Sequence, residues 1–157
     1  MPQDREEHGG KQLSAELGGK IRLVCRRAYA LYDAGELRPA LRLFYRAWLL
    51  LPRPQREWQE SGWILTAIGD TYYRLGDYRS AREALESALH CAGIADNPFT
   101  HLRLGQSLRG LGMKKQAAVH LDIAGSRGGA ELLAREDPDY RGRAALMPQS
   151  SGRSVEQ

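Results

Sequence analysis

The most chemically versatile side chains of this 157-residue chain are four scattered histidines, two cysteines and a number of carboxylates. The sequence contains neither a GxxxxGK phosphate-binding loop nor an HExxH zinc motif. His90 and Cys91 are adjacent, but neighbours on a helix point about 100° apart and cannot comfortably share one tetrahedral metal ion. Glu57, Glu60 and Asp70 recur along one expected helix, which is typical of a solvated face. We therefore expect no catalytic residue, no metal and no cofactor.

Length and composition predict one soluble globular domain. The chain is 42% hydrophobic and 27% charged, as such domains usually are, and its length suits one domain rather than two. No stretch approaches the roughly 20 apolar residues that span a bilayer. Residues 1–10 lack the apolar core of a secretion signal. We therefore expect a cytoplasmic protein, not associated with a membrane, whose Cys25 and Cys91 are reduced.

The positive charge of the chain comes almost entirely from arginine. There are 19 Arg and 4 Lys, and the net charge is +4. The planar guanidinium binds carboxylates with two parallel hydrogen bonds and stacks on aromatic rings, so an acidic protein partner is compatible with this composition. Nucleic acid is an unlikely partner because acidic residues interrupt the basic ones, at Glu16, Asp33, Glu36, Glu57, Glu60 and Asp70.

One spacing of small and apolar residues occurs three times, with steps of seven, five, four and three. The three sets are Ala28, Gly35, Ala40, Phe44 and Ala47; Gly69, Gly76, Ala81, Leu85 and Ala88; and Gly105, Gly112, Ala117, Leu121 and Ala124. The middle glycine of each set separates two apolar runs, as in a helix that ends at a left-handed glycine. The first small residue would let two helices approach closely, and two alanines flank a larger side chain on the second helix. Each set therefore predicts a helix-turn-helix hairpin.

The expected elements follow from this repeat. Asn97 and Pro98 form a good helix start, and Pro54 can begin a helix that includes residues 55–61. We expect helices at about 17–34, 37–51, 55–75, 78–92, 97–111 and 114–125. Gly125 to Gly129 predicts a break, followed by a short capping helix at residues 130–135. Residues 1–16 are expected to be a flexible lead-in and residues 137–157 a mostly disordered tail.

These hairpins resemble tetratricopeptide repeats (TPRs), whose period is about 34 residues. Tyr72 stands where the family has its aromatic residue, and Pro52 where the first repeat has its closing proline; the third repeat has Leu108 and no proline. The resemblance implies an all-α TPR domain over residues 17–136, with repeats at about 21–54, 62–96 and 98–129. It also implies a short right-handed solenoid with a capping helix.

The resemblance further implies a concave groove that binds a protein partner, lined mainly by the first helix of each repeat. Tyrosine, tryptophan and arginine are prominent among its residues, and these types dominate interface energies. The implied groove residues are Arg22, Cys25, Arg26, Tyr29, Tyr32, Trp63, Thr66, Asp70, Tyr73, Arg74, Phe99, Leu102, Arg103, Gln106 and Arg109.

Some of these side chains have a second interpretation. Trp63 and Phe99 lie near helix starts, where they could instead fill the gap between repeats. Asp70 and Arg74 are four residues apart, which predicts an ordinary intrahelical pair. The carboxylate clamp of chaperone-binding TPR domains is not expected, because its positions include Cys25, Tyr29, Ala67 and Phe99, and only Arg103 fits.

Three segments, at residues 57–70, 97–106 and 136–140, resemble small bacterial TPR proteins found beside genes for polymorphic or contact-dependent toxins. This resemblance implies an immunity protein that binds a toxin domain and neutralises it. Alternatives are a type III-like secretion chaperone, although such chaperones are usually acidic, and a general scaffold. If the groove binds the partner, Tyr73→Ala or Arg103→Glu should weaken binding without unfolding the chain.

Overall fold

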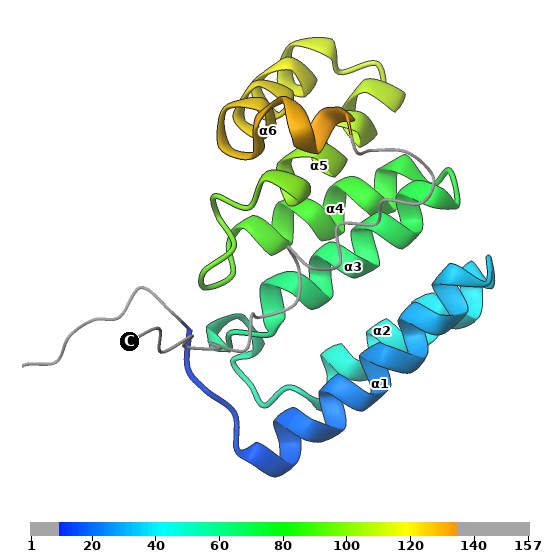
Figure 1. The fold of residues 1–157 in the computed structure, drawn as a ribbon, viewed down its shortest axis with the longest axis vertical. Helices are drawn as coiled ribbons and strands as arrows, with labels where there is room; N and C mark the ends of the chain where they lie inside the picture. Colours follow the sequence, from blue (N-terminus) through cyan, green and yellow to red (C-terminus); the bar gives the residue numbers. More distant parts are fainter. Residues whose placement is uncertain (1–9, 135–157) are drawn as a thin grey trace, which may run out of the picture.

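The computed structural model describes residues 10–134, with side chains up to residue 128, and this part of the chain is helical (Figure 1). Its α-helices are α1 (Ala15–Asp33), α2 (Leu37–Leu50), α3 (Ser61–Arg74), α4 (Tyr78–Leu89), α5 (Pro98–Gly110) and α6 (Lys114–Ala134). A single 3-10 turn, η1 (Gln55–Glu57), precedes α3. Residues 10–134 contain no β-sheet, only an isolated bridge between Lys11 and Trp58. None of the helices described is both long and apolar enough to cross a membrane.

The expected hairpin turns are present at all three middle glycines. Gly35, Gly76 and Gly112 have φ values of +80°, +78° and +79°, the left-handed region that glycine enters without a steric penalty. After each glycine, the next N–H bonds back to the carbonyl five residues earlier, as from Asp77 to Tyr72 at 3.0 Å. This is the Schellman ending of a helix, and it turns the chain into the second helix of each pair.

The close helix contacts that the repeat predicted are confirmed in the second and third hairpins. A Cβ added at Gly69 would come within 2.8 Å of Leu85 Cδ2, and one at Gly105 within 2.7 Å of Leu121 Cγ. Real Cβ atoms do not approach other carbon atoms so closely, so the glycines let α3 pack against α4 and α5 against α6.

The three helix pairs α1–α2, α3–α4 and α5–α6 follow one another along the long axis of the described part of the chain (Figure 1). α3 lies in the middle and is buried on all sides from Ser61 to Thr71. An N-terminal core, which includes Ile21, Phe44 and Ile68, joins α1, α2 and α3 and extends to the end of α4 and the start of α5. A C-terminal core, which includes Leu85 and Leu108, joins α4, α5 and α6.

The helix expected at residues 55–75 is shorter than predicted. Trp58 has an extended backbone (φ −86°, ψ 145°) and separates η1 from α3. Lys11 explains this break, because its N–H donates to Glu57 O (2.7 Å) and its carbonyl accepts from Gln59 N (3.1 Å). A strand-like contact with a segment 46 residues away therefore replaces the helical bonds. Lys11 of the expected lead-in is thus held by main-chain bonds, while residues 1–9 lie outside the described part.

The break and separate capping helix expected after Gly125 are wrong, because α6 runs without interruption from Lys114 to Ala134. Each glycine inside a helix costs only about 1 kcal/mol relative to alanine, which the packing of α6 on α5 can offset. The start of α5 agrees with the prediction. Asn97 Oδ1 accepts from the N–H groups of Phe99 (3.0 Å) and Thr100 (3.1 Å), with Pro98 in the first turn. The expected tail at 137–157 lies outside the described residues.

Candidate functional site

The first helices of the three hairpins are connected by a buried polar chain. Tyr32 of α1 donates its phenol proton to Asp70 Oδ2 of α3 at 2.5 Å. Arg103 of α5 donates from Nε to Asp70 Oδ1, also at 2.5 Å. The side chains of Arg103 and Asp70 are only 8% and 4% exposed, so the ion pair is shielded from water. One carboxylate therefore fixes the positions of α1 and α5 relative to α3.

Aromatic rings and guanidinium groups extend this chain. The Arg103 guanidinium lies over the rings of Tyr73, at 4.7 Å from its centroid, and Phe99, at 5.1 Å. Arg74 lies over the ring of Tyr32 at 4.7 Å. These are cation–π distances, and they couple neighbouring first helices. The predicted Asp70–Arg74 pair is wrong, because Asp70 pairs with Arg103 while Arg74 stacks on Tyr32.

The phenol of Tyr32 is held in its protonated form. Burial raises its pKa above the ordinary value, and the negative charge of Asp70 and the hydrogen bond to it add to the effect. Tyr32 is therefore a donor to Asp70 over the whole physiological range, and the negative charge of the chain stays on the carboxylate.

Most of the predicted groove residues lie inside the protein instead of on an open surface. The buried ones are Cys25, Tyr29, Tyr32, Trp63, Thr66, Asp70, Phe99, Leu102 and Arg103. The contacts explain why the prediction was wrong for them. The Tyr29 ring packs edge-on against Phe44 of α2, with centroids 5.0 Å apart. Leu102 packs against Ala124 and Leu121 of α6. The core interpretation of Trp63 and Phe99 is thus the correct one.

The remaining predicted residues keep some surface. Arg22, Arg26, Arg74 and Arg109 are exposed, and Tyr73 and Gln106 are half-buried. Gln106 accepts from Arg103 at 2.8 Å, so it belongs to the same polar chain. Arg22 and Arg26 lie on α1 two turns and one turn before Tyr29, respectively, on the same stripe of the helix. The accessible part of the predicted site is therefore mainly cationic.

Two polar side-chain atoms near the start of α3 are buried without a hydrogen-bond partner in the described part of the chain. Trp63 Nε1 and Glu60 Oε2 have no hydrogen-bond partner among residues 10–128. Their neighbour Thr66 is satisfied, because its hydroxyl bonds to Gly62 O (2.8 Å) and to Thr100 (2.9 Å). An unsatisfied buried polar group costs about 1–3 kcal/mol. Both atoms are enclosed by the protein, so this cost falls on the fold and neither atom is open to a ligand.

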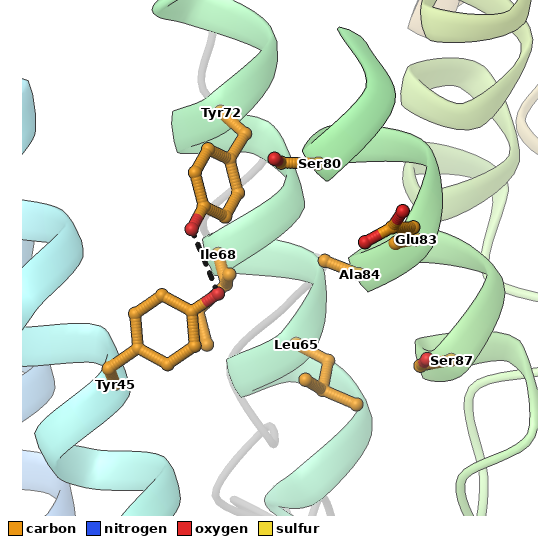
Figure 2. Close-up of a pocket in the computed structure, with 8 residues that line it drawn as sticks. All are labelled: Tyr45, Leu65, Ile68, Tyr72, Ser80, Glu83, Ala84 and Ser87. Atoms are coloured by element: carbon orange, nitrogen blue, oxygen red, sulfur yellow. Dashed lines mark hydrogen bonds between the residues drawn. The ribbon is translucent and has the colours of Figure 1, made fainter. Parts of the chain in front are cut away.

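Sequence reasoning missed a pocket on another side of the protein (Figure 2). It lies between α2 and α4 over α3, has a volume of about 250 Å³, and is lined by Tyr45, Leu65, Ile68, Tyr72, Ser80, Glu83, Ala84 and Ser87. Only Tyr72 had been noted. The sequence signal was Tyr45, an exposed aromatic next to buried Phe44, but nothing local pairs it with α4.

The histidines are less scattered than the sequence suggests. His101 of α5 and His120 of α6 stack with centroids 5.2 Å apart, and their Nδ1 atoms are 3.0 Å apart. Among residues 10–128, no three His, Cys, Asp or Glu side chains are grouped as metal ligands would be. Cys25 and Cys91 are buried free thiols, and burial raises the pKa of Cys25 to about 12.

Comparison of the chain with models of known protein families, and with curated protein sequences, gave no match.

Proposed function

We propose that this protein binds a polypeptide through the side of the stack formed by α1, α3 and α5, and that it carries out no chemical reaction. The three hairpins would form a short TPR solenoid with this side as its groove. The observation that carries the proposal is the Tyr32–Asp70–Arg103 chain, which holds the three first helices in register. A fixed spacing of helices gives a binding face that needs little reorganisation on association.

The expected partner is an acidic segment. Asp70 is already neutralised by Arg103, whereas Arg22, Arg26, Arg74 and Arg109 are exposed and available to carboxylates. Tyr73 would supply a ring surface beside them.

The biological role that we propose is that of a bacterial immunity protein, which neutralises a toxin domain by covering its surface. This role rests on the resemblance of residues 57–70, 97–106 and 136–140 to TPR proteins encoded beside toxin genes. A type III-like secretion chaperone would hold an extended segment in the same face. A toxin gene next to the gene for this chain, and rescue of toxin-poisoned cells by its expression, would distinguish the two roles.

A peptide-display selection tests the binding face directly. The full chain is used to select from a library of random twelve-residue peptides, and the enriched peptides are measured by fluorescence anisotropy. We expect enrichment of Asp and Glu, and at least about fivefold weaker binding to the Arg26→Ala/Arg74→Ala variant, which loses two charge-assisted contacts.

The matched control is Arg42→Ala/Arg46→Ala, which removes two exposed arginines from α2. These changes should leave the affinity unaltered. Selected peptides without acidic enrichment, or equal losses in both double variants, would reject this face as the binding site. Arg103→Glu is unsuitable for the test, because it would place a second buried carboxylate beside Asp70 and unfold the stack.

A further inference from the structure

The pocket between α2 and α4 is lined by polar atoms that converge from three helices (Figure 2). Tyr45 comes from α2 and Tyr72 from α3, and their hydroxyl oxygens are 3.0 Å apart. Ser80, Glu83 and Ser87 face them from α4, while Leu65 and Ile68 of α3 form the floor. Its volume of about 250 Å³ is just below the roughly 300–1,000 Å³ of ordinary small-molecule sites. It is suited to the end of one side chain.

Hydrogen-bond accounting shows that the pocket has more acceptors than donors. The Ser80 hydroxyl donates to Asp77 Oδ2 at 2.7 Å, so its oxygen has only lone pairs left for a ligand. One of the two phenol protons is used between Tyr45 and Tyr72. The Glu83 carboxylate can only accept when ionised. A ligand with several N–H donors would match this arrangement.

Glu83 has no ion pair within the described part of the chain, whereas several other carboxylates there do. Glu16, Glu57, Asp70, Glu86 and Asp96 all pair with Lys or Arg side chains. Arg79 precedes Glu83 by four residues on α4, the ordinary spacing for a helical pair, yet no such pair forms within residues 10–128. The negative charge of Glu83 is therefore uncompensated beside the pocket.

The phenols contribute oxygen atoms and ring faces but no charge. Burial raises the pKa of Tyr45 above its ordinary value, and its hydrogen bond to Tyr72 and the nearby charges of Glu83 and Asp77 act in the same direction. Tyr45 and Tyr72 meet edge-to-face, with ring centroids 6.3 Å apart. The faces of such rings attract cations.

We propose that this pocket binds the cationic end of an arginine or lysine side chain from a partner polypeptide. The guanidinium or ammonium group donates to the Glu83 carboxylate and to the oxygens of Ser80 and Tyr45. The methylene groups of the side chain lie on Leu65 and Ala84. Glu83 disfavours an anion, and a purely apolar group would leave the polar lining unsatisfied. This site is separate from the α1–α3–α5 face, and it selects the opposite charge.

A pair of model compounds tests the proposal on the full chain. Nα-acetylarginine N-methylamide is compared with Nα-acetylcitrulline N-methylamide, which has a similar shape but a neutral urea group. Binding is followed by the backbone amide shifts in two-dimensional NMR spectra. We expect the arginine compound to shift amides around Tyr45 and from Ser80 to Ser87 in a saturable way, and the citrulline compound to leave them unchanged.

Variants show whether the carboxylate is responsible. Glu83→Gln, at an exposed position that should not affect folding, should weaken arginine binding at least about threefold. Glu36→Gln is the matched control, since Glu36 is an exposed carboxylate at the start of α2 that makes no side-chain capping bond. Equal shifts with citrulline and arginine would overturn the proposal. So would unchanged affinity in Glu83→Gln.

Discussion

Asp70 accepts hydrogen bonds from Tyr32 and Arg103 at a depth where water does not screen charge. Burying an ion pair is costly in itself, and such a pair often stabilises less than apolar residues would. Removing one member is worse, because the other remains charged and buried. The value of this pair lies in its position between three helices, since any change in their spacing would separate the charges.

Replacing Asp70 with asparagine tests this at the level of one residue. Asp70→Asn keeps the size of the side chain but leaves Arg103 without its carboxylate, so we expect the free energy of unfolding to fall by about 3–5 kcal/mol. Urea denaturation followed by circular dichroism measures the change. The control Asp96→Asn removes an exposed pair with Arg127 and should cost at most about 1 kcal/mol. Similar losses in the two variants would contradict the role assigned to Asp70.

The contact between His101 and His120 determines which nitrogens carry protons. His101 Nε2 is 2.7 Å from the carbonyl oxygen of Ala95, which can only accept, so this nitrogen is the donor. In the neutral ring, His101 Nδ1 is then an acceptor, and the proton between the rings comes from His120 Nδ1.

This pair predicts a pH dependence of stability. Burial lowers the pKa of His120 below its ordinary value of 6.5, and the neighbouring His101 lowers it further, while Glu86 opposes the shift. The unfolded chain therefore binds more protons than the folded chain as the pH falls below about 6.5. Because protons then bind preferentially to the unfolded chain, the free energy of unfolding is highest above about pH 6.5 and decreases as the pH falls below it.

Urea unfolding at pH 7.5 and pH 5.5 measures this effect. The wild-type chain should lose more stability between the two values than His120→Gln, whose amide can still donate to His101 Nδ1. His90→Gln, at an exposed position, should behave like the wild type. An identical pH dependence in all three proteins would show that the histidine pair is not responsible.

Among the elements, the first glycine of a hairpin sets the distance between its two helices. Gly69→Ala would bring a methyl group within 2.8 Å of Leu85 Cδ2, so Leu85 or the helices must move. We expect a loss of about 1–3 kcal/mol from overpacking. The control Gly19→Ala adds a methyl group to α1 where no atom lies within 4 Å, and should stabilise by about 0.5–1 kcal/mol. Thermal denaturation of both variants measures the contrast, and stabilisation by Gly69→Ala would contradict it.

The sequence allowed the elements to be predicted wherever a signal was local. The Schellman turns at Gly35, Gly76 and Gly112 depend on residues within five positions, and the Gly69–Leu85 contact lies within one hairpin. The start of α3 could not be found in this way. It depends on Lys11, whose main chain pairs with Glu57 and Gln59 from a distant part of the sequence.

The predicted site had the same limitation. The resemblance pointed to the first helix of each hairpin, and three of the residues that it named, Asp70, Arg74 and Arg103, take part in one network through Tyr32. It could not indicate which side chains are buried. Whether Tyr29 faces a groove or packs on Phe44 depends on how the helices are rotated against each other. The Tyr45–Glu83 pocket and the His101–His120 pair require two helices to be packed before their side chains meet.

At the scale of the whole described chain, the stack has two apolar cores that are joined through the central hairpin. The N-terminal core lies mainly among α1, α2 and α3 and extends to Ala88 of α4 and Phe99 of α5, while the C-terminal core lies among α4, α5 and α6. In stacked repeats each unit contacts only its neighbours, so damage at one end is expected to remain partly local. α3, buried along most of its length, should be the most protected element.

Hydrogen exchange with two matched variants tests this arrangement. Phe44→Ala opens a cavity in the N-terminal core and Leu108→Ala one in the C-terminal core, and both side chains are fully buried. Each should cost about 2–5 kcal/mol. We expect Phe44→Ala to lower amide protection mainly in α1 and α2, and Leu108→Ala mainly in α5 and α6, with α3 the last helix to exchange in both. If each variant instead lowered protection equally in all six described helices, the hairpins would unfold as one unit. The Tyr32–Asp70–Arg103 chain would then be the first connection to examine, because it is the polar link that spans all three hairpins.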